Sequence, residues 1–77
     1  MVQELKKRFI KYMADHYSRM AASEIDLLLE KSIQRVVKNS NFSETVLSEV
    51  VREMTEEGYS KPEILAHVNI IDIEQRT

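Results

Sequence analysis

Residues 58–64, Gly-Tyr-Ser-Lys-Pro-Glu-Ile, contain the one glycine and the one proline of this 77-residue chain. A glycine after an amphipathic segment commonly ends a helix, because it adopts left-handed backbone angles without strain. Ser60 and Glu63 have the spacing of a capping box, and Pro62 falls in the first helical turn, where its missing N–H does no harm. The stretch therefore predicts that one helix ends at Gly58 and that the next begins just after Ser60.

The composition extends this prediction to the whole chain. Apolar residues make up 43% and charged residues 31%, so the sequence has the make-up of a folded domain. A compact all-β fold needs several turns, and one glycine with one proline supplies too few turn residues. We therefore expect one all-α domain over residues 1–77, with a core so small that a second subunit becomes the leading additional stabiliser.

Helical periodicity places two stripes of apolar side chains in the first half of the chain. The first, over residues 2–20, consists of Val2, Leu5, Phe9, Met13, His16 and Met20, flanked by Ile10, Tyr12 and Tyr17. A second stripe begins at Ile25, about half a turn away around the helix axis at roughly 100° per residue. One straight helix would bury opposite sides at its two ends, so we predict a break near residues 22–23, with Ser23 and Asp26 as a capping pair.

A polar stretch at residues 38–41 predicts a loop, and Ser43 after it predicts the cap of a third helix. The expected helices therefore lie near residues 2–21, 24–39, 44–57 and 61–70, packed as a compact bundle. The segment from Val68 to Ile73 remains open between helix and extended arm. Val68 and Ile71 continue a helical stripe, whereas Ile70 and Ile73 fall off it and the β-branched content suits an extended arm.

Charge is distributed unevenly along the chain. Residues 1–20 carry five basic and two acidic side chains, whereas residues 43–77 carry eight acidic and three basic ones. The basic segment is compatible with nucleic-acid binding or with a position beside the acidic half of the same chain or of a second one. The interpretation that we favour is two solvated helix faces, since a nucleic-acid-binding domain is normally basic overall.

Residues 58–70 resemble the first helix and turn of a helix-turn-helix, with a serine cap, an apolar pair and then Asn69. The sequence departs from that pattern at Leu65, where the family usually has alanine, and at Asn69, where it usually has glycine. The resemblance implies an alternative function, a DNA-binding transcriptional regulator with a degenerate helix-turn-helix near 58–77. Residues 72–77 would form its recognition helix, which is short and carries two acids. We therefore expect no nucleic-acid partner.

The residues typical of catalytic and metal sites do not form a recognisable constellation. The chain has no cysteine, and no glycine-flanked serine is present. His16 falls on the first apolar stripe, where packing is the expected role, and His67 lies four residues after Glu63, a pair that no second helix repeats. We therefore predict no catalytic residue, no cofactor and no metal, and hence no enzyme activity.

The remaining feature of the sequence that indicates a function is the apolar surface of its expected helices. The first helix has an apolar arc of about 160°, wider than one neighbouring helix covers, and aromatic and methionine side chains are enriched in interface cores. The predicted partner and self-association residues are Phe9, Tyr12, Met13, Tyr17, Met20, Leu27, Ile70, Ile71 and Ile73. We expect a small regulatory or adaptor protein that forms a homodimer and binds a larger protein of unknown identity.

We also expect a cytoplasmic location without membrane insertion. Lys11 interrupts the apolar stretch that follows the basic residues 6–8, so the pattern of a secretion signal is broken. The longest strongly apolar run is residues 27–29, far below the roughly 20 residues that a membrane-spanning helix needs.

Overall fold

The computed structural model describes residues 2–76 and the side chains of residues 3–75. Met1, Thr77 and the side chains of Val2 and Arg76, which include one member of the first predicted stripe, lie outside this part. The fold is all-α, as the sequence predicts. Its four helices are α1 (Val2–Tyr17), α2 (Ala22–Asn39), α3 (Glu44–Glu56) and α4 (Lys61–Arg76).

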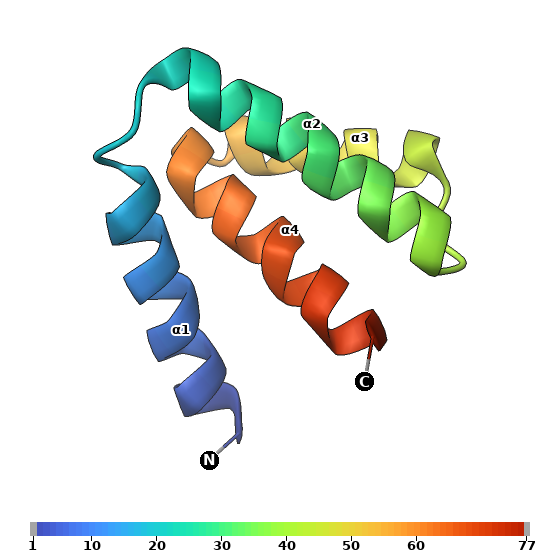
Figure 1. Ribbon diagram of the computed structural model, residues 1–77, viewed down its shortest axis with the longest axis horizontal. Coiled ribbons are helices and arrows are strands. Elements are labelled where there is room, and N and C mark those ends of the chain that lie inside the picture. The colour runs from blue at the N-terminus through green and yellow to red at the C-terminus, as the bar shows by residue number, and fades with distance from the viewer. Residues whose placement is uncertain (1, 77) are drawn as a thin grey trace.

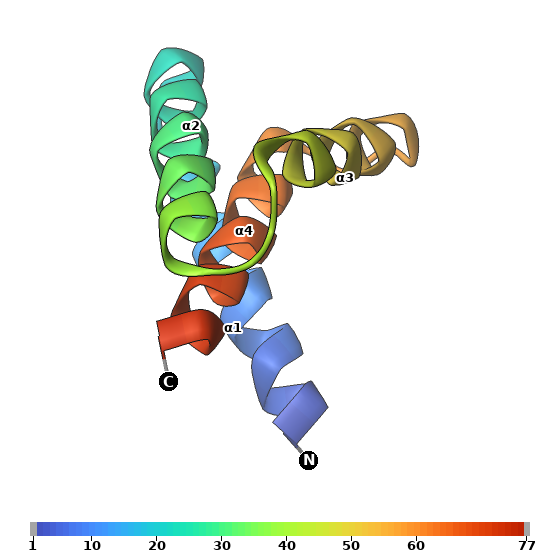
Figure 2. The same ribbon diagram turned by 90° about the vertical axis from the view of Figure 1, so that its right-hand side faces the viewer.

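The last helix in chain order is the central one in space. Figure 1 shows α4 lying between α1 and α2, and both of these helices pack directly on it. After the 90° turn of Figure 2, α2 and α3 point in different directions with α4 between them. Three helices therefore surround a fourth, and α4 is buried on several of its sides.

One side of α4 forms an aliphatic core with α2 and α3. Val36, Leu47, Ile64 and Val68 are buried there, and half-buried apolar side chains pack around them. These surrounding residues are Leu29, Ile33, Val37, Val51, Met54 and Ile71. The core contains only aliphatic and methionine side chains, so its stability comes from burial of apolar surface.

The turn between α3 and α4 forms as the sequence predicts. Gly58 has a φ of 97°, its N–H donates to the carbonyl of Thr55, and the N–H of Tyr59 donates to the carbonyl of Met54. This pair of hydrogen bonds defines a Schellman motif, and a side chain at Gly58 would be strained by the positive φ. The N–H of Ser60 then donates to the Glu63 carboxylate at 2.9 Å, which confirms the capping box.

Two caps were predicted elsewhere, and only one of them forms. The Ser43 hydroxyl accepts the N–H of Val46 at 3.2 Å, so the start of α3 is confirmed. The predicted Ser23 cap is wrong, because α2 begins at Ala22 and its N-cap is Ala21, which makes no side-chain hydrogen bond. The carbonyl of Ala21 accepts the N–H groups of Glu24 and Ile25, so extended backbone at this residue is enough to start the helix.

The first helix ends four residues earlier than predicted. It stops at Tyr17, and the Ser18 hydroxyl donates to the carbonyl of Asp15 at 2.6 Å. A serine that hydrogen-bonds to the backbone of the preceding turn competes with continued helical pairing. The predicted break between the two stripes therefore exists, but it covers residues 18–21 instead of 22–23.

The segment from Val68 to Ile73, whose sequence is compatible with a helix or an extended arm, is helical. The backbone continues as α4 without interruption from Lys61 to Arg76. The helix-turn-helix predicted near 58–77 is therefore wrong in its geometry, because no turn occurs at residues 66–70 to separate a recognition helix. A helix that buries apolar residues on several sides lacks the one-sided stripe from which helices are recognised, and this explains the ambiguity.

Candidate protein-binding surface

The apolar arc of α1 is divided between a packed part and an exposed part. Ile10, Met13 and Tyr17 are half-buried on the side toward α4, whereas Leu5, Phe9 and Tyr12 are 59%, 54% and 75% exposed. The division follows from helix geometry, because α4 covers only part of an arc of about 160°. We call Leu5, Phe9 and Tyr12 the α1 ridge.

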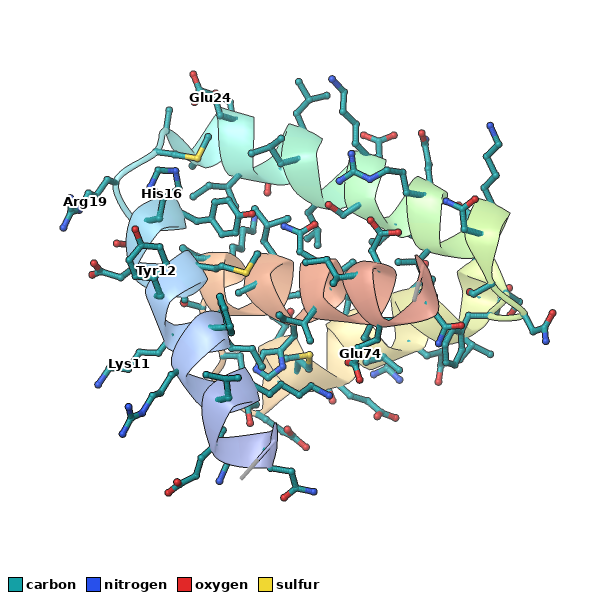
Figure 3. The ribbon with its side chains drawn as sticks, turned by 60° about the horizontal axis from the view of Figure 1, so that its bottom comes forward. Lys11, Tyr12, His16, Arg19, Glu24 and Glu74 are labelled. Atoms are coloured by element: carbon teal, nitrogen blue, oxygen red, sulfur yellow. The ribbon has the colours of Figure 1, made fainter. Side chains whose placement is uncertain are left out.

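The α1 ridge is continuous and bordered by positive charge. With Arg8 its residues line a shallow, open depression along the helix. Figure 3 shows Lys11 and Tyr12 on the side of α1 that faces away from α4. Neither Arg8 nor Lys11 forms a salt bridge within the described part of the chain. The surface thus combines three large apolar side chains with two cations that have no intramolecular counterion there.

The other predicted partner residues of the first two helices lie in different environments. Met13 and Tyr17 line a groove between α1 and α4, so they belong to the packing of the fold as well as to its surface. Met20 is half-buried in the connection between α1 and α2. Leu27 is 52% exposed on α2 but lines no recess with the α1 ridge.

The three predicted isoleucines of the C-terminal segment are separated by the helical conformation of α4. Ile70 is buried, Ile71 packs against the aliphatic core, and only Ile73 is exposed. Ile73 shares the groove with Met13 and Tyr17. Because Ile70 and Ile71 stabilise the fold, the exposed partner surface predicted for this segment reduces to Ile73.

A polar network at the same groove was not predicted. Asn69 donates to the Tyr17 hydroxyl at 2.6 Å and accepts from the Ser32 hydroxyl at 2.7 Å, so one amide joins α1, α4 and α2. Arg35 donates to the same Ser32 hydroxyl at 3.2 Å, and its Nε lies 3.5 Å from Oδ2 of Asp72. Asp72 is only 5% exposed, and a buried carboxylate requires such charged and hydrogen-bonded surroundings.

This network holds three helices in register instead of presenting a reactive group. Asn69 was interpreted as a turn residue, which concealed its role. The signal that would have revealed it is the placement of Ser32, Asn69 and Asp72 among apolar neighbours on α2 and α4, since buried polar side chains need partners.

The two histidines have different surroundings. His16 is exposed, with its ring 5.8 Å from that of Tyr17, so the prediction that it is packed in the interior is wrong. His67 is half-buried with its ring edge-on to Tyr59, and this burial lowers the pKa of its imidazole despite the opposing effect of Glu63.

Glu63 is engaged as part of the helix cap. The hydrogen bond from the Ser60 N–H, together with that from the Ser60 hydroxyl, holds the pKa of its carboxyl below the ordinary range. Residues 2–76 contain no cluster of three or more histidine, cysteine or acidic side chains arranged to hold a metal ion.

A second exposed apolar surface occurs on α3. Val46 and Val50 are 47% and 40% exposed, whereas the neighbouring Leu47 is buried. Glu53 and Glu57 continue the same line at i+7 and i+11 from Val46, since residues at these spacings share a helix face and Glu57, the C-cap residue just beyond α3, keeps helical backbone angles. We call Val46, Val50, Glu53 and Glu57 the α3 stripe. Neither glutamate forms a salt bridge within residues 2–76.

Within the described chain, each helix is too short or too polar to traverse a lipid bilayer. Comparisons with protein-family models, with curated proteins and with solved structures found no match. The surfaces of the chain itself therefore carry the functional argument.

Proposed function

We propose that this protein is a non-catalytic protein–protein interaction module, a small regulator or adaptor that self-associates and binds a larger protein. The observation that carries the proposal is the α1 ridge, whose large apolar side chains are exposed beside the half-buried part of the helix. Large apolar side chains that are contiguous and rimmed by charge are typical of protein-binding surfaces, whereas isolated exposed ones are not.

The chemistry of the α1 ridge indicates the kind of partner. A row of apolar side chains at spacings of three and four residues accepts the apolar face of another helix. Arg8 beside the ridge and Lys11 next to it favour a partner helix bordered by aspartate or glutamate, because complementary charge fixes the register of the contact. We infer an amphipathic, acidic helix as the bound element.

The roles of the polar residues support a non-catalytic function. Ser43 and Ser60 cap helices, and Glu63 completes the second cap. His67 packs against an aromatic ring, so several side chains suited to acid–base or nucleophilic chemistry already have structural roles. The proposal requires no cofactor and no metal. We do not propose DNA binding, since α4 has neither the turn nor the exposure of a recognition helix.

Photo-crosslinking in the native host tests the proposal. A photoreactive phenylalanine analogue at position 12 should form an adduct with a larger protein, whose crosslinked segment is then sequenced by mass spectrometry. Phe9→Glu should abolish the adduct, because it places a carboxylate in the ridge. Leu27→Glu is the matched control, since Leu27 is nearly as exposed as Phe9 but lies outside the depression.

The identity of the crosslinked segment decides the outcome. An acidic amphipathic helix that is captured with Leu27→Glu but lost with Phe9→Glu supports the proposal. An adduct that persists with Phe9→Glu, or one that maps to a basic or extended segment, contradicts it.

A further inference from the structure

Two exposed apolar surfaces of this chain are bordered by charges of opposite sign. The α1 ridge consists of three large apolar side chains beside Arg8 and Lys11, and the α3 stripe consists of two valines followed by Glu53 and Glu57. Both are exposed within one copy of the chain, so the fold itself does not bring them together. The charges beside the two surfaces are opposite in sign, with two cations on one and two carboxylates on the other.

We propose that the α1 ridge is covered by the α3 stripe of a second copy of this chain. The inference rests on the proposed function, because it takes the ridge to be a protein-binding surface and names what binds there. Val46 and Val50 are four residues apart, as are Leu5 and Phe9, so the two rows have matching axial spacing. The glutamates of α3 would then approach the basic border of α1.

Charge selects this pairing over the two alternatives between like surfaces. An α1-to-α1 contact would bring Arg8 and Lys11 of both copies together, and an α3-to-α3 contact would do the same with Glu53 and Glu57. Like charges at an interface oppose association, whereas opposite charges steer it and fix its register. The salt bridges on α3 leave the pairing possible, because Arg52 pairs with Glu49 and Glu56 and with neither stripe glutamate.

The mobility of the two surfaces is limited by their place in helices, which lowers the entropy lost on binding. The contact is nevertheless small, with three apolar side chains on one surface and two on the other. Small interfaces support weak and transient association. We therefore expect self-association with a dissociation constant in the micromolar range or weaker, decreasing in strength as salt screens the exposed charges.

Reciprocal charge reversal tests the pairing by sedimentation equilibrium of the full chain at concentrations up to about 1 mM. R8E/K11E and E53K/E57K should each weaken self-association about tenfold or more. Combining all four substitutions in one chain should restore it, because every α1–α3 contact then joins opposite charges again. Mixing the two variants should restore association between unlike chains, whose α1–α3 contacts also join opposite charges. All four positions are exposed, so circular dichroism should show unchanged helix content.

The matched control is K31E/K38E, which changes net charge by the same amount as R8E/K11E but at exposed positions on α2. It should leave self-association unchanged. A wild-type chain that stays monomeric at about 1 mM overturns the inference, and so does a quadruple variant that fails to recover.

Phe9→Glu in the same assay separates this inference from the proposed function. Loss of self-association with Phe9→Glu, without recovery in the quadruple variant, would keep the α1 ridge as a binding surface and exclude the α3 stripe as its occupant. A monomeric wild type that still forms the position-12 adduct with another protein would likewise overturn only the inference.

Discussion

The two sides of α4 are packed by different means. Toward α3 and the adjoining part of α2, the contacts are aliphatic, with Val36, Leu47, Ile64 and Val68 removed from water. Elsewhere on α2, Ser32 and Arg35 add polar contacts to Asn69 and Asp72 of α4. Toward α1, the contact includes the Tyr17–Asn69 hydrogen bond and the exposed Lys6–Glu74 ion pair at 2.9 Å. Aliphatic packing contributes most of the stability, whereas directional polar contacts fix position. We therefore expect α1, which these polar contacts position on α4, to respond to their removal more than α3 does.

The largest expected effect lies on the aliphatic side. Ile64→Ala should reduce the free energy of unfolding by about 2–5 kcal/mol, because it leaves a cavity at a residue that is 1% exposed. Urea denaturation measures this loss. Ile73→Ala serves as the control at an exposed position of the same helix, and an equal loss there would contradict the distinction between core and surface.

The second-largest effect is expected when the Asn69 hydrogen bonds are removed. Asn69→Ala should cost about 1–3 kcal/mol, since it removes the partner of both the Ser32 and the Tyr17 hydroxyl groups. Hydrogen exchange should accelerate more for the amides of α1 than for those of α3. Tyr17→Phe removes only one of the two contacts and should cost about 0.5–1.5 kcal/mol. Uniform acceleration in all four helices would show that α1 does not open separately.

A smaller effect is expected at the ion pair. Lys6→Gln should change the free energy of unfolding by at most about 1 kcal/mol, because both Lys6 and Glu74 are substantially exposed and water screens their attraction. Thermal denaturation at low and high salt is the measurement. A larger loss would mean that charge, and not the Asn69 network, holds α1 in place.

The smallest effect concerns the pH dependence of the free energy of unfolding, which we attribute to His67 on α4. The pKa of His67 is lowered in the folded chain, so the unfolded chain binds a proton more readily as pH falls through the ordinary value near 6.5. Stability from the neutral imidazole is therefore complete above that value and decreases below it. Denaturation of wild type and His67→Gln at pH 7.5 and 5.5 tests this, and the variant should lose less stability than wild type between the two.

A second titration acts at lower pH. The pKa of Glu63 is also lowered on folding, so its capping contribution is present above its ordinary value near 4.5 and is lost as pH falls below it. The two groups thus act in separate pH ranges. A loss of stability between pH 7.5 and 5.5 that is the same in His67→Gln would assign it to another group.

The elements that depend on local chemistry were predictable from the sequence. Gly58, Ser60 and Glu63 determine their turn through hydrogen bonds within a few residues, and Ser43 does the same for α3. Two other features, the length of α4 and the start of α2, could not be predicted from local chemistry. The length of α4 was ambiguous because burial on several sides removes the periodic pattern, and the start of α2 was misplaced because its N-cap is a backbone conformation without a side-chain signal.

The candidate surface was predictable only in part. Phe9 and Tyr12 were predicted as partner residues and are exposed, but Leu5 was assigned to the apolar stripe without a partner role. Which part of a wide arc stays uncovered depends on where the neighbouring helix lies, and no local pattern encodes that position. The exposure of Val46 and Val50 likewise depends on where the neighbouring helices lie.

The position of α4 in chain order has a consequence for folding. Its contacts with α1 close long loops, since Tyr17 and Asn69 are 52 positions apart in sequence. As the ribosome synthesises the chain from its amino end, α1, α2 and α3 emerge before the helix on which they pack. Until residues 61–76 are synthesised, the apolar faces of these three helices remain largely exposed to solvent and can bind chaperones or other nascent chains. Folding is therefore expected to be a late and concerted event, triggered by the arrival of the last helix.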